Sequence, residues 1–377
     1  MNRTKRGGLD ARPGTNRPSL TTLVQIGGMW MVVAVCGPAA AIEPSRELHH
    51  IVTGMQNAPV QSPVSVLTIR DESGTSHPIE AMATSPDGQF MCVATDDNRL
   101  HLIRTDSRET IDVAEAHRDR IRSVAFSPRG DRVASVGNDG RLAVWSIGRG
   151  LQPVQTMART PALAKVVYMP DGRSLLAVGF IDRMYRIGRR HSPGETRRLR
   201  CGDMRSVDVS ESGEIAVAGR RGTLHLFNRD GRMQVRTLEQ GSINAVKFLP
   251  GSQRLVTASD DGCVAVYDVA TDRILDHIHL DHGRLFALAV LGSDAVAVAG
   301  SDDAIRLIDL SGGRVQAELR GHRGSIVSLQ NLATGGSSPD TAAQQLVSAG
   351  YDGTLRFWNL SPTGPESLMA SGDSLER

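Results

Sequence analysis

The sequence has few aromatic residues, since Phe, Trp and Tyr together make up 4% of its 377 residues. Because bulky rings are scarce, small and branched aliphatic side chains must fill any core. The four cysteines, Cys36, Cys92, Cys201 and Cys263, are scattered and form no CxxC pair. This spacing excludes a dense disulfide framework and a haem attachment, so we expect unpaired thiols with a structural role.

Charge of one sign is also lacking, because 43 basic and 41 acidic residues leave a net charge of +2. So small an excess gives no argument for nucleic acid binding, and we expect none. Lysine is nearly absent: only Lys5, Lys165 and Lys247 occur, and arginine supplies the other basic residues. We interpret this preference as a compositional bias of the genome and not as a functional feature.

Apolar runs long enough to span a membrane are absent after residue 41. Before it, a basic stretch is followed by the apolar run Ile26–Cys36 and then by Ala39-Ala40-Ala41. This order is typical of a secretory signal. We therefore predict that residues 1–41 are a signal peptide, cleaved before Ile42, and that the protein is exported to the periplasm or the extracellular space.

Two other interpretations of this segment stay open. Val33-Ala34-Val35-Cys36 resembles a lipoprotein cleavage box, although Val35 stands where a small residue is wanted. Residues 23–41 could also remain as an uncleaved membrane tether, but a span needs about 20 apolar residues and Pro38 interrupts this one. Under each interpretation, residues 42–377 lie outside the cytoplasm.

From Ile79 onward the sequence repeats itself with a period of about 40 residues. In each unit a turn follows one short apolar run and precedes another. The turns are Asp97-Asn98, Asp139-Gly140, Asp182-Arg183, Arg221-Gly222, Asp261-Gly262, Asp302-Asp303 and Asp352-Gly353.

One unit shows what each repeat contains. It has four β-rich runs, at Ile121–Phe126, Arg132–Val136, Arg141–Ile147 and Val154–Met157. Four short strands in about 40 residues are typical of one blade of a β-propeller. A single blade cannot bury both of its faces, so blades must stack around an axis. We predict an all-β fold, a seven-bladed propeller of four-stranded antiparallel blades over residues 64–362.

Two units carry histidine, serine, aspartate and tryptophan at matching positions. These residues are His117, Ser135, Asp139 and Trp145 in one unit, and His322, Ser348, Asp352 and Trp358 in the other. With this pattern the chain resembles the WD-repeat (WD40) family, as an exported, bacterial-type member, although no unit ends in a literal Trp-Asp. The resemblance implies that each set forms a buried hydrogen-bond network joining the loop before a blade to its middle turn. The units that lack these residues are expected to rely on apolar packing.

Both sets also contain the residue types of a nucleophilic triad. Ser135 and Ser348 fall in mid-strand, however, and no GxSxG motif is present. A histidine pair, His277 and His279, lies on one face of a predicted strand, but zinc would need a third converging ligand. We expect a solvated outer strand there, and we predict no catalytic residue, no metal and no cofactor.

The last unit lacks an outer strand, because Ser361-Pro362-Thr363-Gly364-Pro365 cannot form one. Upstream of the first unit, Val64–Ile69 reads as a strand without a partner. We predict that it completes the last blade, which closes the ring and leaves no open edge between first and last blades. Residues 42–63 are expected to be a linker with a short helix, and residues 363–377 a disordered tail.

The resemblance implies a non-catalytic interaction scaffold that binds a protein or peptide on one face, as a monomer or within a hetero-complex. The alternatives are an accessory subunit of an envelope enzyme complex and a propeller hydrolase or lyase. The predicted face combines the loops between blades with the turns beside the acid, and its arginines favour an acidic partner. The predicted partner-binding residues are Arg118, Arg120, Arg122, Phe180, Ile181, Arg183, Arg205, Arg220, Arg221 and Tyr351.

Overall fold

The computed structural model describes residues 23–26, 29–32, 49–52 and 58–360, except 158–159, 189–192, 200–201, 239, 282 and 333–343. The chain divides into two compact units, residues 1–46 and 47–377. Within the first unit, β1 (Leu23–Ile26) pairs antiparallel with β2 (Met29–Val32). The rest of the predicted signal peptide and the predicted tail lie outside the described residues. No helix among the described residues is long and apolar enough to cross a membrane.

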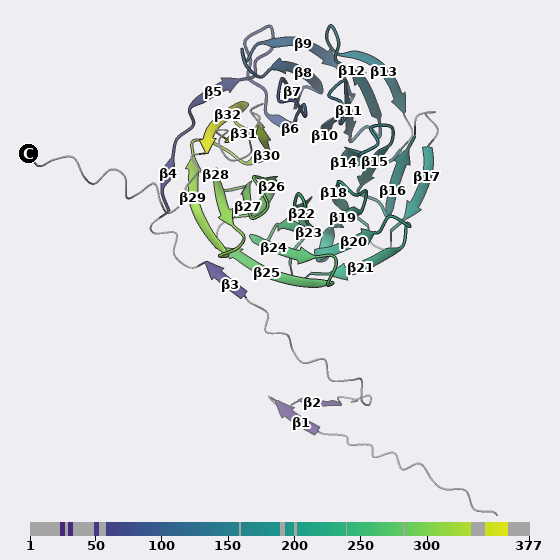
Figure 1. The fold of residues 1–377 in the computed structure, drawn as a ribbon, viewed down its shortest axis with the longest axis vertical. Helices are drawn as coiled ribbons and strands as arrows, with labels where there is room; N and C mark the ends of the chain where they lie inside the picture. The colour runs from purple at the N-terminus through teal and green to yellow at the C-terminus, as the bar shows by residue number, and fades with distance from the viewer. Residues whose placement is uncertain are drawn as a thin grey trace, which may run out of the picture. The chain divides into compact units, whose positions relative to one another are not determined.

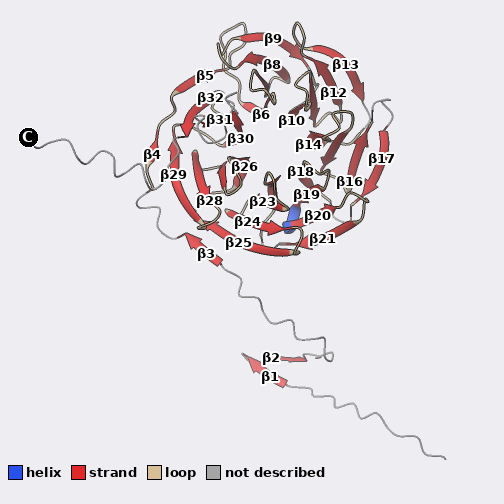
Figure 2. Cartoon of the chain, viewed as in Figure 1, coloured by secondary structure: helices blue, strands red, loops and turns tan. Residues whose placement is uncertain are grey.

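The second unit is a ring of seven antiparallel blades around an axis (Figure 1), and this confirms the predicted fold. Its described residues form strands, turns and loops, with one short 3₁₀ turn, η1 (Arg220–Gly222) (Figure 2). The inner strands are β6 (Ile79–Thr84), β10 (Ile121–Phe126), β14 (Leu163–Tyr168), β18 (Met204–Val209), β22 (Ile243–Phe248), β26 (Leu285–Val290) and β30 (Ile326–Leu332). The second strands are β7 (Phe90–Thr95), β11 (Arg132–Gly137), β15 (Leu175–Gly179), β19 (Ile215–Gly219), β23 (Arg254–Ser259), β27 (Ala295–Gly300) and β31 (Gln344–Gly350).

Two further strands complete each blade on its outer side. The third strands are β8 (Arg99–Arg104), β12 (Leu142–Ser146), β16 (Arg183–Ile187), β20 (Thr223–Phe227), β24 (Cys263–Asp268), β28 (Ala304–Asp309) and β32 (Thr354–Leu360). The outer strands of blades one to six are β9 (Thr110–Glu115), β13 (Gln152–Met157), β17 (Pro193–Arg198), β21 (Met233–Thr237), β25 (Arg273–Leu280) and β29 (Arg314–Arg320).

The ring closes through a strand from the other end of the repeat region. The outer strand of blade seven is β5 (Ser65–Thr68), which pairs antiparallel with β32, with Thr68 opposite Thr354 and Ser65 opposite Phe357. This confirms the predicted closure. The chain then crosses from the outer edge of blade seven to the inner strand of blade one.

The segment before β5 differs from the predicted linker with a helix. It contains two short strands, β3 (His49–Val52) and β4 (Val60–Gln61), which pair in parallel with β25 and β29. Tertiary context explains the difference, because the outer strands of blades five and six offer unpaired backbone groups along their edges. The solvated outer strand expected at the histidine pair is also wrong in part, since His277 is 7% exposed and lies opposite His49 of β3.

The core is divided into seven apolar clusters, each shared by two neighbouring blades. The cluster between blades seven and one joins Leu355 and Phe357 to Ile79 and Met91, for example. Alanine, valine and leucine fill most of these clusters, as the scarcity of aromatic residues predicts. Two of the cysteines, Cys92 and Cys263, are buried and unpaired among the described residues.

Candidate functional site

In blade two, His117 joins the loop before the blade to its middle turn. Its Nδ1 lies 2.9 Å from Asp139 Oδ1, and its Nε2 lies 2.8 Å from Ser135 Oγ. The indole of Trp145 donates a hydrogen bond to the same hydroxyl at 3.2 Å. Burial lowers the pKa of His117, which favours the neutral imidazole.

Blade seven repeats this arrangement, with shorter contacts to the serine. His322 Nδ1 lies 3.0 Å from Asp352 Oδ2, and its Nε2 lies 2.7 Å from Ser348 Oγ. Trp358 Nε1 donates to Ser348 Oγ at 2.9 Å. Burial of Asp352 would raise its pKa, but hydrogen bonds from His322, Thr354 and the backbone N–H of Arg323 hold it well below the usual range.

The two serines are fully buried, at 0% exposure each. Each hydroxyl is already bonded to a histidine and a tryptophan, and the tryptophans are 6% and 1% exposed. A substrate carbonyl could reach neither oxygen without unfolding the blade. The arrangement therefore supports a blade-stiffening network and does not support a nucleophilic triad.

Other blades place different polar groups at the same turn. In blade five, Gln240 replaces the histidine and accepts a hydrogen bond from Thr257 Oγ1 at 3.0 Å. In blade six, Arg306 is 1% exposed and lies 2.5 Å from Asp302 and 3.2 Å from Glu318. Apolar packing alone was expected in blade six, so the buried ion group is a finding that the repeat pattern did not indicate.

The histidine bonds also fix which segments share one side of the ring. Because His117 and His322 precede inner strands and bond to middle turns, the loops between blades and the turns between second and third strands lie on the same side. We call this side the loop face.

At the axial end of the loop face, predicted residues from three blades come together around Glu80. Arg120 Nε lies 3.0 Å from Glu80 Oε1, and burial raises the pKa of this carboxyl. The Arg122 guanidinium lies 5.7 Å from the centre of the Phe180 ring, and Phe180 is 40% exposed. Tyr351 is 39% exposed, and its pKa is raised by burial and by the charge of Glu80. We call Arg120, Arg122, Phe180 and Tyr351 the mouth cluster.

The other predicted partner-binding residues are less uniform. Arg220 Nε donates to Asp203 at 2.6 Å, and Arg205 lies 3.5 Å from the same carboxylate, so both arginines are already paired within the chain. Ile181 is partly buried and packs on the core cluster between blades two and three. The side chains of Arg118, Arg183 and Arg221 are exposed, and the structure does not bring them into the mouth cluster.

Known proteins match parts of this chain. The sequence profile described as "WD domain, G-beta repeat" matches residues 65–104, 108–146, 232–268 and 313–359. The chain contains WD40 repeats.

Several curated relatives match part of this chain. A "U3 small nucleolar RNA-associated protein 21 homolog" of Schizosaccharomyces pombe is 31% identical over 43% of this chain and 18% of its own length. A "guanine nucleotide-binding protein subunit beta" of Oryza sativa is 26% identical over 56% of this chain and 60% of its own length. An uncharacterized WD repeat-containing protein of Synechocystis is 26% identical over 41% and 44%. The chain thus spans less than two thirds of each of these relatives.

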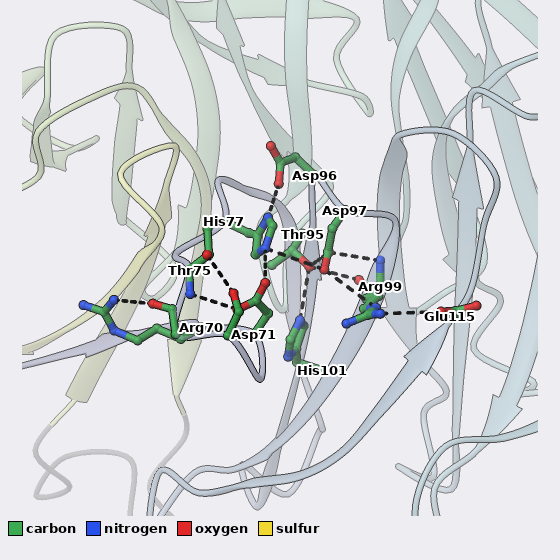
Figure 3. Close-up of polar contacts among 12 residues, drawn as sticks. Arg70, Asp71, Thr75, His77, Thr95, Asp96, Asp97, Arg99, His101 and Glu115 are labelled. Carbon is green, nitrogen blue, oxygen red and sulfur yellow. Dashed lines mark hydrogen bonds and ion pairs between the residues drawn. The ribbon is translucent and has the colours of Figure 1, made fainter.

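One polar cluster on the loop face was missed by the sequence argument (Figure 3). His77 lies on the crossing between β5 and β6, where its Nδ1 is 3.0 Å from Asp96 and its Nε2 is 3.2 Å from Asp71. Asp97 is 4.0 Å from Nε2 and accepts a hydrogen bond from Thr95 at 2.5 Å. The hydrogen bond to Asp71 is the main cause of a raised His77 pKa.

The repeat pattern explains why His77 was missed. The WD40 histidines His117 and His322 stand four residues before their inner strands, whereas His77 stands two residues before β6. The one available signal was the acidic pair Asp96-Asp97 in the turn of blade one. Among the described residues, no group of acidic, histidine and cysteine side chains forms a metal site.

Proposed function

We propose that this WD40 propeller is a non-catalytic scaffold that binds an acidic protein or peptide segment at the mouth cluster. The observation that carries the proposal is the exposed ring of Phe180 beneath the Arg122 guanidinium. Turns favour Gly, Asn, Asp and Ser for their own geometry, so an exposed phenylalanine in a turn calls for another role. Aromatic and arginine side chains are enriched among residues that contribute most to binding.

The charges of the mouth cluster favour an acidic partner. Arg122 Nε donates a hydrogen bond to Asn138 Oδ1 at 2.8 Å. This partner is a neutral amide, so the contact does not balance the charge of the guanidinium. Arg120 pairs with Glu80 at 3.0 Å, and the side chain of that carboxylate is almost fully buried. An incoming carboxylate would therefore meet two arginines against one buried acid, and association should weaken as salt is added.

The test compares variants of the mouth cluster with matched variants elsewhere on the ring. A partner isolated with the chain should bind Phe180→Ala and Arg122→Glu at least about tenfold more weakly, as expected for residues at a binding hot spot. Val154→Ala removes a side chain that is also exposed, on outer strand β13, and Arg129→Glu changes an exposed arginine in a turn on the opposite face. Unchanged affinity in both mouth variants, with melting temperatures preserved, would exclude this site.

We also propose that the chain is exported, because its basic start, apolar run and Ala39-Ala40-Ala41 have the order of a secretory signal. The protein isolated from its native cells should begin at Ile42 and occur in the periplasm, at the membrane or outside the cell. Amino-terminal sequencing with cell fractionation measures this. An intact Met1 in the cytoplasmic fraction would contradict export and would leave the binding proposal untouched.

A further inference from the structure

A cavity of about 540 Å³ lies between blades three and four, which are neighbours in the ring (Figure 1). Blade four lines it with two turns, Ser212-Gly213 between β18 and β19 and residues 228–231 between β20 and β21. These turns stand at the strand ends remote from the middle turn, so the cavity opens on the side opposite the loop face. Its volume is within the range of small-molecule sites in proteins.

The floor of the cavity belongs to the apolar cluster between the two blades. Met169, Leu176, Met184 and Phe227 are each at most 8% exposed, and partly buried Ile215 packs against them. All five residues line the cavity. The cavity therefore reaches the core at this place, and an apolar group that enters it is removed from water.

Three arginines complete the lining, and the structure shows how two of them are directed. Arg186 lies opposite Leu176 in the pairing of β15 with β16, and residues directly opposite each other share a face of the sheet. The Arg186 side chain therefore leaves blade three on the face that packs against blade four. Arg197 Nη1 donates a hydrogen bond to the carbonyl of Gly231 at 2.6 Å, and its guanidinium lies 5.1 Å from the centre of the Phe227 ring.

The charge of the cavity is clearly positive. Arg186, Arg197 and Arg229 stand against one acid of the lining, Asp230. Among the described side chains, none of the three guanidinium groups is paired with a carboxylate, and Arg186 and Arg229 are exposed. Three like charges thus surround an apolar floor without a counter-charge at hydrogen-bonding distance.

Two acids adjacent to the lining in sequence do not change this balance. Asp171 accepts hydrogen bonds from the backbone N–H groups of Arg173 and Ser174 in its own turn, at 2.7 and 3.0 Å. Glu214 accepts a hydrogen bond from the Ser212 hydroxyl at 3.2 Å. Neither carboxylate lines the cavity, so an anion that enters it meets the arginines first.

We propose that this cavity binds a small amphipathic anion, in which one alkyl chain or aromatic ring carries a carboxylate or a phosphate. The apolar part lies on Leu176, Met184 and Phe227, and the anionic head accepts charge-assisted hydrogen bonds from Arg186 and Arg229. The site lies on the face opposite the mouth cluster. It does not depend on the partner proposed for that cluster.

Calorimetric titration of the full chain with hexanoate, octanoate and decanoate tests the apolar part of the site. Each carboxylate is kept below the concentration at which it forms micelles. Each added methylene should tighten binding about fourfold while the chain enters the apolar floor. Octanol has the chain without the charge, and it should bind at least about tenfold more weakly than octanoate.

Arginine variants test the anionic part. Arg186→Met and Arg229→Met should each weaken octanoate binding at least about fivefold, because each removes a donor to the head group. Both side chains are exposed, so the fold should persist, and melting temperatures check this. The matched control is Arg173→Met, which changes an exposed arginine in a turn on the same face but outside the lining, and it should leave the affinity unchanged.

Three results would overturn the proposal. Equal binding of octanol and octanoate would show an apolar cavity without anion recognition. Binding that does not depend on chain length, or that Arg173→Met weakens as much as Arg186→Met, would show a general effect of surface charge. No binding of any of the carboxylates would exclude the site. Each of these results would leave the mouth cluster proposal untouched, because that site lies on the other face.

Discussion

His117 and His77 both hydrogen-bond to aspartates on the loop face, yet their surroundings shift their pKa values in opposite directions. The side chain of His117 is 0% exposed, and burial lowers its pKa below 6.5. The side chain of His77 is 21% exposed and lies within 4.0 Å of three carboxylates, and its hydrogen bond to Asp71 raises its pKa. Burial, and not the identity of the pair, decides which form of the imidazole is favoured.

The two histidines therefore differ in how their contributions to stability depend on pH. A neutral His117 bridges Ser135 and Asp139 without carrying charge, and its contribution to stability decreases only as pH falls below 6.5, where the unfolded chain takes up a proton. His77 contributes most below 6.5, where folded and unfolded chains are both protonated, and its contribution is lost as pH rises through the raised pKa. The two sites should therefore give stability curves of opposite slope.

Removal of β5 should have the largest effect on stability, because pairing between β5 and β32 closes the ring. Deleting residues 1–70 removes the outer strand of blade seven and the buried side chain of Ile69, together with partly buried Leu67. Loss of the buried Ile69 side chain alone should reduce the free energy of unfolding by about 1.5–3 kcal/mol, and partly buried Leu67 adds to this loss. Denaturant unfolding measures the loss.

The matched control is deletion of residues 1–60, which removes β3 and Val60 of β4 but keeps β5. We expect a much smaller loss, since β3 covers an outer edge and completes no blade. Equal stabilities of the two truncated chains would show that β5 is dispensable for closure.

The next prediction concerns the histidine–serine–tryptophan networks of blades two and seven. Trp358→Phe removes one indole N–H and leaves Ser348 Oγ short of a donor in a fully buried place, which should cost about 1–3 kcal/mol. Trp145→Phe in blade two should cost a similar amount through Ser135. Thermal unfolding of both variants measures this, and for Trp145→Phe we expect a loss that hardly varies above pH 6.5. No loss in either variant would contradict a stiffening role for the networks.

The smallest effect is expected for the cluster around His77. His77→Gln keeps hydrogen-bonding capacity but removes the charge, and partly exposed ion pairs contribute less than about 1 kcal/mol. The variant should be less stable than the unmutated chain below pH 6.5, and the difference should vanish as pH rises through the raised His77 pKa. A constant difference at all pH values would show that His77 acts by packing alone.

The repeat spacing predicted the blades well because it depends on local turn chemistry. Gly140 and Gly353 have φ values of 67° and 72°, a conformation that glycine adopts without strain. A Cβ on Gly140 would also lie 1.9 Å from the carbonyl oxygen of Thr160. Turns of this kind are visible in the sequence, and closure through β5 followed from a missing strand and a spare one.

Features that depend on distant partners could not be predicted in the same way. The helix expected before residue 63 is wrong at His49–Val52, because only the folded ring offers the edge of β25 to that segment. Pairing of Arg220 with Asp203 likewise depends on how the middle turn of blade four approaches the loop before that blade.

Blade seven has a consequence for how the chain acquires its structure during synthesis. The ribosome produces β5 before any blade, but its partner β32 is produced after all the others. During elongation β5 therefore has no native partner, and its edge is open to incorrect pairing. Completion of the ring is a late event that joins the two most distant parts of the repeat region, so chains that stop short of Thr354 should remain open and prone to aggregation.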